Sequence, residues 1–187
     1  ALNQILAQAD PQKRVRGVTA LGQVAYIRTS RSLSEVTKPV YHLTTYLFDS
    51  ADQVRLQAAL AIEKVSENQV TDQLAELIIQ QMSAGAKDPV ERIRQAALVV
   101  YSRLGKREAH SILVEALADM SPQVRETAVK LLSQIGKSVI PTLHPMMLDA
   151  ANPNLRKTIA LVLCRIDKQE YGALISAHII NNLLTIY

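Results

Sequence analysis

A short pattern recurs five times along the chain and constrains its fold more than any other feature of the sequence. Each copy has an Asp, a short gap, and then an apolar residue directly before an Arg. The Arg residues, separated by 39, 39, 31 and 31 residues, are Arg16, Arg55, Arg94, Arg125 and Arg156. The Asp lies six positions earlier in the first four copies and seven in the fifth, giving Asp10, Asp49, Asp88, Asp119 and Asp149. Repetition at such a period indicates stacked units that bury their apolar faces against one another.

Each copy of the pattern is predicted to begin a helix. Small and apolar residues recur one position before each Arg and three, six and ten positions after it, and this spacing forms one helical face. Asp10-Pro11 and Asp88-Pro89 fit an N-cap followed by Pro at the first helical position. Gly105 and Gly136 lie just past the last apolar position, where a helix C-cap favours Gly. The predicted repeat helices cover residues 11–27, 50–65, 89–104, 121–135 and 152–166.

A second set of helices is predicted between the first. These partner helices are expected at residues 1–8, 35–48, 70–83, 108–118, 139–148 and 169–185. No stretch alternates between apolar and polar residues as a half-buried strand does. We therefore predict an all-α protein, a right-handed α–α superhelix of about five helix pairs plus a final helix, with residues 1–187 forming a single array.

At these residues the sequence resembles the HEAT-repeat family, and most closely the short HEAT-like repeats of the phycobilisome-lyase type. The hallmark Asp-Pro…Val-Arg-x-x-Ala-Ala-x-x-Leu-Gly is matched best by residues 88–97 and next best by residues 122–128. The resemblance implies an α-solenoid in which Asp bonds helix-start amides and Arg runs along the stack. The residues of this structural ladder would be Asp10, Arg16, Asp49, Arg55, Asp88, Arg94, Asp119, Arg125 and Arg156.

No residue set typical of a catalytic or cofactor site occurs in the sequence. The iron-binding branch of the same superfamily carries repeated His-Glu pairs, whereas the histidines here stand alone, at positions 42, 110, 144 and 178. Cys164 is the single cysteine, which excludes an intrachain disulfide, and its position predicts a buried structural thiol. No Gly-rich phosphate loop or nucleophile elbow is present. We predict no enzymatic activity, no catalytic residue, no metal site and no cofactor.

Basic residues recur on the helix face opposite the predicted core. In HEAT solenoids the second helix of each pair lines the concave surface, so the resemblance places these residues on an inner ridge. The predicted ridge consists of Arg14, Lys64, Arg92, Arg103, Lys130, Lys157 and Arg165. The positions five after each Arg add Leu21, Leu60, Val99 and Leu161. A mixed basic and apolar groove suits an acidic amphipathic segment; alternatively, the apolar residues pack between repeats and the charges are only solvated.

These features predict a non-enzymatic scaffold that binds another protein, or another domain of its own chain, as a regulatory region of a larger multidomain protein. Nucleic-acid binding is the alternative, weakened by a net charge of only +4 and the lack of Trp. A bilin-lyase-type subunit is a further alternative that only the generic repeat supports. The sequence has no apolar run long enough for a membrane span and no signal segment, so we expect a cytoplasmic location.

The two ends of the sequence carry expectations of their own. The chain opens at Ala1, inside a predicted helix, which favours a piece of a longer protein. Residues 168–187 are more apolar than one groove of a neighbouring repeat can cover. A terminal repeat is expected to present a polar outer face. We therefore expect either further chain beyond Tyr187 or self-association through this last helix.

Overall fold

The computed structural model describes residues 9–31, 37–105, 109–149 and 152–173, and it divides into two compact units, Ala1–Ala109 and His110–Tyr187. The described residues contain α-helices and short 3-10 helices, and no β-strand occurs among them. The prediction of an all-α repeat fold is confirmed. The continuity of one array across the two units stays a prediction.

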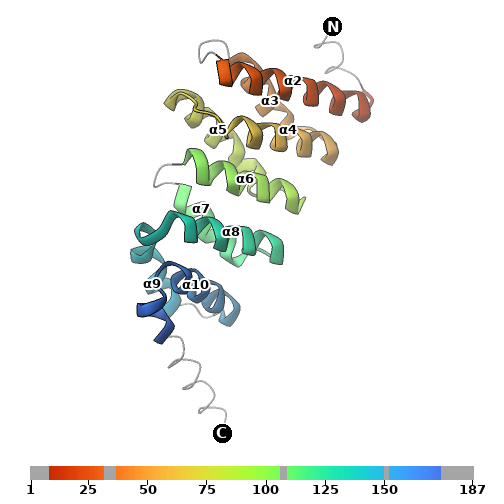
Figure 1. The fold of residues 1–187 in the computed structure, drawn as a ribbon. Coiled ribbons are helices and arrows are strands. Elements are labelled where there is room, and N and C mark those ends of the chain that lie inside the picture. Colours follow the sequence, from red (N-terminus) through yellow and green to blue (C-terminus); the bar gives the residue numbers. More distant parts are fainter. Residues whose placement is uncertain (1–8, 32–36, 106–108, 150–151, 174–187) are drawn as a thin grey trace. The chain divides into compact units, whose positions relative to one another are not determined.

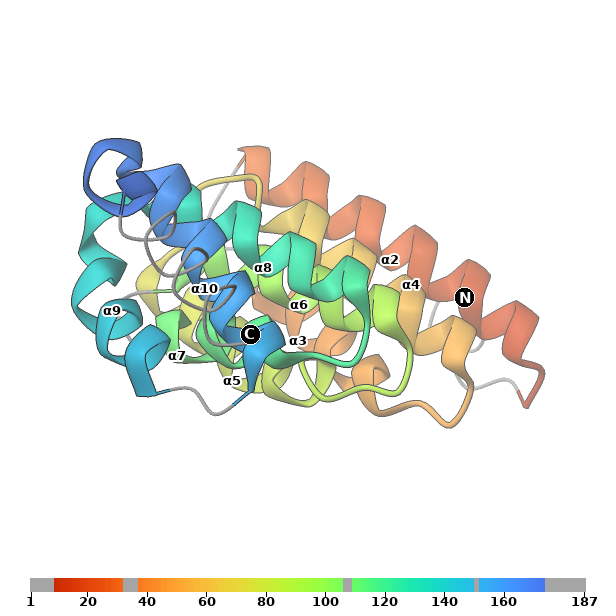
Figure 2. The ribbon, with the colours of Figure 1, turned by 90° about the horizontal axis from the view of Figure 1, so that it is seen from below.

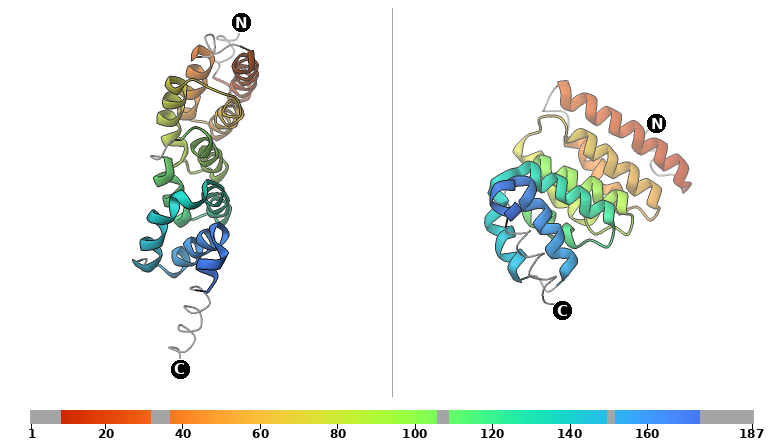
Figure 3. Two further views of the ribbon diagram at one scale, coloured as in Figure 1. Left: turned by 60° about the vertical axis from the view of Figure 1, so that its left-hand side comes forward. Right: turned by 60° about the horizontal axis from the view of Figure 1, so that its bottom comes forward.

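The first unit is a stack of helices in two layers. Its elements are α2 (Pro11–Arg31), α3 (Thr37–Thr45), the 3-10 helix η2 (Tyr46–Phe48), α4 (Asp52–Val65), α5 (Asp72–Gly85) and α6 (Glu91–Leu104). Helix α4 packs between α2 and α6, and α3 and α5 contact each other in the second layer (Figure 1). Figure 2 shows α2, α4 and α6 running side by side. The left view of Figure 3 looks nearly along these helices and separates the two layers.

Small residues let the repeat helices of the first unit approach closely. Ala58, Ala59 and Ala97 are completely buried on α4 and α6. On α2, a Cβ atom added to Gly22 would lie 2.7 Å from the Cβ of Ala61, which is closer than real side chains come. Larger side chains at these positions would push the helices apart, since protein interiors are close-packed. The small residues of the repeat pattern therefore set the spacing of the layer.

The second unit repeats the same arrangement. Its elements are α7 (Ala109–Glu115), which spans the boundary between the units, η3 (Ala116–Ala118), α8 (Pro122–Ile135), η4 (Gly136–Val139), α9 (Ile140–Asp149) and α10 (Pro153–Ile166). Helices α8 and α10 contact each other, α9 packs against α10, and η3 touches both α8 and α10. Helical backbone resumes at residues 168–173, where buried Tyr171 places its hydroxyl 3.0 Å from Nδ1 of His144.

The described helices begin and end within a few residues of the predicted boundaries. Gly105 caps α6, since its N–H donates to the carbonyl of Tyr101 at 2.8 Å. Gly136 follows α8 with a φ of 81°, a backbone conformation that favours glycine. Pro145 lies inside α9 without ending it. The predicted helix 1–8 and most of the predicted helix 169–185 lie outside the described residues.

Candidate functional site

One arginine stands at the same helical position in all five repeat helices. Its backbone N–H donates to the carbonyl of the N-cap residue and so makes the first i to i−4 bond of the helix. These five bonds are Arg14 to Asp10 at 3.2 Å, Arg55 to Ala51 at 3.1 Å, Arg94 to Val90 at 3.3 Å, Arg125 to Ser121 at 3.1 Å and Arg156 to Asn152 at 3.0 Å. In the first four copies the guanidinium donates to a carbonyl of the loop that precedes its helix.

The first repeat departs from the predicted register. Arg14, which the sequence assigned to the basic ridge, takes the ladder position, and Arg16, which it assigned to the ladder, is exposed. The reason is that Asp10 directly precedes α2, which begins at Pro11, and its own carbonyl accepts the backbone N–H of Arg14. In the second and third repeats the ladder Asp instead lies two residues before the N-cap. The ladder pattern of the first repeat is therefore shifted by two residues.

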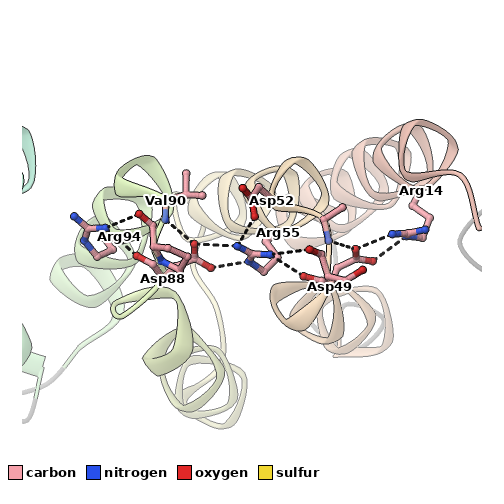
Figure 4. Close-up of polar contacts among 10 residues, drawn as sticks. Arg14, Asp49, Asp52, Arg55, Asp88, Val90 and Arg94 are labelled. Atoms are coloured by element: carbon pink, nitrogen blue, oxygen red, sulfur yellow. Dashed lines mark hydrogen bonds and ion pairs between the residues drawn. The ribbon is translucent and has the colours of Figure 1, made fainter.

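Two arginines make bidentate ion pairs with the next repeat, and these are drawn in Figure 4. Nε and Nη2 of Arg14 each lie 2.9 Å from a carboxylate oxygen of Asp49. Nε and Nη2 of Arg55 lie 2.7 and 3.3 Å from the carboxylate oxygens of Asp88. Only 13% of either arginine side chain is exposed, so these pairs are largely shielded from water. Paired forks of this kind fix the register of one repeat against the next.

Further ladder contacts lie within single repeats. Nη1 donates to the carbonyl six residues earlier in three copies, at 2.9 Å for Arg55, 2.8 Å for Arg94 and 2.7 Å for Arg125. The carboxylates of the corresponding Asp residues accept N-cap amides, from Ala51 at 2.9 Å, Val90 at 2.8 Å and Ser121 at 2.8 Å. The guanidinium of half-buried Arg156 has no hydrogen bond or ion pair among the described residues. The side chain of Asp149 lies outside the described part.

Burial and hydrogen bonding act in opposite directions on Asp49. Burial by itself would raise the pKa of its carboxyl group. The hydrogen bonds from Arg14 and from the N–H of Ala51, with the charges of Arg14 and Arg55, outweigh burial and hold the pKa of Asp49 below its ordinary value. Asp49 is therefore ionised at neutral pH and is held by hydrogen bonds from Arg14 and Ala51, as a structural residue would be.

The predicted ridge residues of the first unit are engaged by acidic neighbours. Lys64 forms an ion pair with Glu67, and its ammonium group lies 5.1 Å from the ring centroid of Tyr26. Arg103 lies 3.8 Å from the same Glu67. It also donates to the carbonyl of Glu63 at 2.9 Å. These contacts lie near the ends of α4 and α6. Only the Lys64–Glu67 pair is close in sequence, whereas the contacts of Arg103 with Glu67 and Glu63 form between two repeats.

Arg92 is the last predicted ridge residue of the first unit. Its Nη2 atom lies 4.0 Å from Oε2 of Glu63, and its Nη1 atom lies 3.5 Å from Oε1 of Gln95. The Glu63 oxygen is buried and accepts no hydrogen bond within the described part of the chain. The nearby guanidinium compensates its charge. Together with Lys64, Arg103 and Arg14, Arg92 leaves the first unit with little uncompensated positive charge on its predicted ridge.

The ridge residues of the second unit are exposed. Lys130 on α8 and Lys157 and Arg165 on α10 form no hydrogen bond or ion pair with any described residue. Lys157, Leu161 and Arg165 are spaced four apart and therefore share one face of α10. Leu161 lies between the two cations, with 46% of its surface exposed. Helix α8 presents a matching row in Glu126, Lys130 and Gln134, all exposed.

The apolar residues five positions after each predicted Arg do not behave alike. Leu21 is buried because of the two-residue shift in the first repeat. Leu60 and Val99 are half-buried. Leu161 alone among the four is an exposed large hydrophobic residue. Packing thus accounts for Leu21 and in part for Leu60 and Val99, and among these four positions the exposed leucine is the one on α10.

Other candidate residues show no chemistry of their own. Cys164 is half-buried, not buried as predicted, because it lies at the margin of the packed face of α10. Among the described residues no three His, Cys, Asp or Glu side chains are grouped to hold a metal ion. His178 lies outside these residues. None of the described helices is long and apolar enough to cross a membrane.

Comparison with known proteins agrees with this architecture. Residues 111–179 match the family model described as HEAT repeats. No curated protein sequence matches the chain. Among solved structures, the chain is similar to the complex of CpcE and CpcF of phycocyanin lyase from Nostoc sp. PCC7120, with a TM-score of 0.56 and 20% identity over 92% of this chain and 66% of that one.

Two further structures show the same likeness. Cex1p gives a TM-score of 0.63 at 20% identity, over 92% of this chain but only 36% of its own. A designed armadillo repeat protein in complex with the peptide (KR)4 gives 0.55 at 19% identity, over 89% of this chain and 80% of that one. Identities this low establish the fold alone. The chain therefore has a fold of stacked helical repeats similar to those of these proteins.

Proposed function

We propose that this protein is a non-enzymatic scaffold that binds another protein, or another domain of its own chain, through the outward face of its repeat helices. The observation that carries the proposal is the contrast between the ladder and this face. Most ladder side chains are engaged by hydrogen bonds and ion pairs within a repeat or between neighbouring repeats. The outward positions of α8 and α10 carry exposed cations beside an exposed leucine.

The fold suits such a role because repetition provides a long surface on rigid elements. One of the similar structures, the designed armadillo repeat protein, is a complex with a peptide. Its peptide is basic, whereas the outward face of α8 and α10 is itself basic, so a partner of opposite charge is expected here. Fold likeness alone would support many functions, and the exposed side chains of this chain narrow the choice.

The two alternative functions find less support. Nucleic-acid binding would call for a broad basic surface, but the predicted cations of the first unit are compensated by Glu63 and Glu67. A lyase function would rest on similarity to the CpcE and CpcF complex, which at 20% identity concerns the fold. No specific contact among the described residues favours either.

Site-specific photocrosslinking in the native host tests the proposal. A benzophenone amino acid is placed in the full-length protein at Gln23 on α2 or Gln134 on α8, both exposed on outward faces, and at exposed Glu76 on α5 as the control in the other layer. We expect nuclease-resistant protein adducts at Gln23, Gln134 or both, and none at Glu76. The adduct should re-form as a saturable complex from the two purified proteins.

Two results would contradict the scaffold role. Adducts that disappear on nuclease treatment would favour the nucleic-acid alternative. Adducts found equally at Glu76, or at none of the three positions, would show that the outward face is not used for recognition.

A further inference from the structure

Exposed side chains occupy equivalent positions on α8 and α10, one, five and nine residues after Arg125 and Arg156. Because α8 and α10 pack against each other, the outward rows of the two helices are neighbours. We call these residues the α8–α10 face; they are Glu126, Lys130 and Gln134 on α8 and Lys157, Leu161 and Arg165 on α10. Three cations and one anion give this face a net positive charge.

The α8–α10 face differs from the corresponding face of the first unit in the availability of its charges. There, Glu67 lies between Lys64 and Arg103, and Glu63 lies beside Arg92. A partner carboxylate would have to displace these internal anions. On α8 and α10, Lys130, Lys157 and Arg165 have no described anion within ion-pair distance, so a partner carboxylate meets no competitor.

The spacing of the residues on the α8–α10 face defines the shape of a ligand that could bind there. Lys157 and Arg165 are eight residues apart on one helix and therefore lie about 12 Å from each other along the axis. Leu161 lies midway between them and is 46% exposed. A ligand that complements this row needs an apolar side chain flanked by carboxylates on both sides. An amphipathic helix with leucines on one face and glutamates bordering it satisfies this requirement.

We infer that the α8–α10 face is the docking site for an acidic amphipathic helix of a partner protein. Leu161 would anchor the apolar face of that helix, and Lys130, Lys157 and Arg165 would pair with its bordering carboxylates. This inference rests on the proposed scaffold function and assigns it to one unit, one pair of helices and one chemistry of partner. The equivalent face of α4 and α6 takes no part.

Binding of designed peptides to the full chain tests the inference. The probe is a fluorescent helical peptide of about 15 residues, or about 22 Å, with leucines on one face and glutamates along its borders. Its counterpart carries lysine at every glutamate position. We expect saturable binding of the glutamate peptide, weakened by salt, and no saturable binding of the lysine peptide.

Charge-reversal variants locate the site. The triple variant Lys130→Glu, Lys157→Glu and Arg165→Glu should bind the glutamate peptide about tenfold or more weakly, because each exposed attraction becomes a repulsion. The same variant should gain binding of the lysine peptide, which a misfolded protein could not do. Leu161→Asp should weaken binding of the glutamate peptide, because it removes the apolar anchor. Lys38→Glu, an exposed lysine in the first turn of α3, is the matched control and should bind like the unmodified protein.

The possible outcomes separate the inference from the scaffold function. If the triple variant binds the glutamate peptide as tightly as the unmodified protein, or if the lysine peptide binds the unmodified protein equally well, the assignment to this face is overturned. Photocrosslinked partners would then still support the scaffold. If the partner found by crosslinking binds while neither peptide does, the acidic-helix chemistry is wrong. If no partner and no peptide binds, the scaffold function itself fails.

Discussion

Two arginines on α2 lie two residues apart and have opposite surroundings. Nε and Nη2 of Arg14 both pair with the carboxylate of Asp49, whereas Arg16 is exposed. The sequence could not separate them, since both lie a short distance after Asp10 and both suit a helix. Burial distinguishes them: Gly17, Val18 and Leu21 are buried, and they follow Arg14 at the spacing at which Ala58, Ala59 and Ile62 follow Arg55.

The first prediction compares these two arginines. Arg14→Ala should lower the free energy of unfolding measurably more than Arg16→Ala does, because it leaves a largely buried Asp49 carboxylate without its bidentate partner. Arg16→Ala should change it by less than about 0.5 kcal/mol, as exposed substitutions usually do. Urea denaturation followed by circular dichroism measures both. Equal losses in the two variants would refute the shifted register.

The second prediction concerns pH. The pKa of Asp49 is lower in the folded protein than its ordinary value of 3.8, although burial opposes the hydrogen bonds of Arg14 and Ala51. A lowered folded pKa adds stability above the unfolded pKa, and that stability is lost as the pH falls through the folded pKa. We therefore expect no loss from this group between pH 7 and about pH 5, and a progressive loss below about pH 4.

Asp49→Asn isolates this contribution from those of other carboxyl groups. The variant should be less stable than the unmodified protein at pH 7, and the difference should shrink in urea denaturation at about pH 3. A difference that stays constant with pH would show that Asp49 has the same pKa in the folded and unfolded chains.

At the scale of the helices, most of the positions of the helices could be predicted from the sequence. Apolar periodicity located all five repeat helices because a 3.6-residue period is a local property. The same Asp-Pro pair, however, serves two roles: Pro11 is the first residue of α2, whereas Pro89 precedes the N-cap Val90 of α6. Such a two-residue ambiguity is settled by contacts between helices, which local patterns do not contain.

The candidate site was predictable only in part for a related reason. Helical spacing correctly placed Lys130, Lys157 and Arg165 on an exposed face. It could not indicate that Glu67, just beyond the end of α4, pairs both with Lys64 and with Arg103 of the next repeat helix. The partners of long charged side chains across a helix interface depend on distances that are set only when the helices pack.

The third prediction contrasts two helical glycines. Gly22→Ala should destabilise the protein by about 1–3 kcal/mol, because the new Cβ atom would lie 2.7 Å from the Cβ of Ala61 and force α2 and α4 apart. Gly172→Ala should stabilise it by about 0.5–1 kcal/mol, because its nearest side-chain neighbour is 3.9 Å away and alanine favours the helix. Thermal unfolding of both variants is the measurement. Stabilisation by both substitutions would show that α2 and α4 are not as close as described.

At the scale of the whole molecule, the cations of the predicted ridge have different surroundings in the two units. The chain carries a net charge of +4. In the first unit, acidic side chains compensate the cations on the predicted ridge, and in the second unit three cations of that ridge remain exposed. Local unpaired charge, more than net charge, determines where an oppositely charged partner is attracted. A modestly basic protein can therefore be selective for acidic segments without attracting nucleic acid generally.

The fourth prediction concerns how far a destabilising substitution affects other helices, since each repeat contacts mainly its neighbours. Ala128 on α8 is completely buried, so Ala128→Asp places an unpaired carboxylate in the core at a cost of about 3 kcal/mol or more. Hydrogen exchange should accelerate throughout α8 and α10, while α2 and α4 keep most of their protection. The control Gln134→Asp adds the same charge at an exposed position of the same helix and should leave exchange in α10 unchanged. If hydrogen exchange in the Ala128→Asp variant matched that of the control, the packed face of α8 would be wrongly assigned. If exchange accelerated equally in α2 and α4, the chain would unfold as one cooperative body.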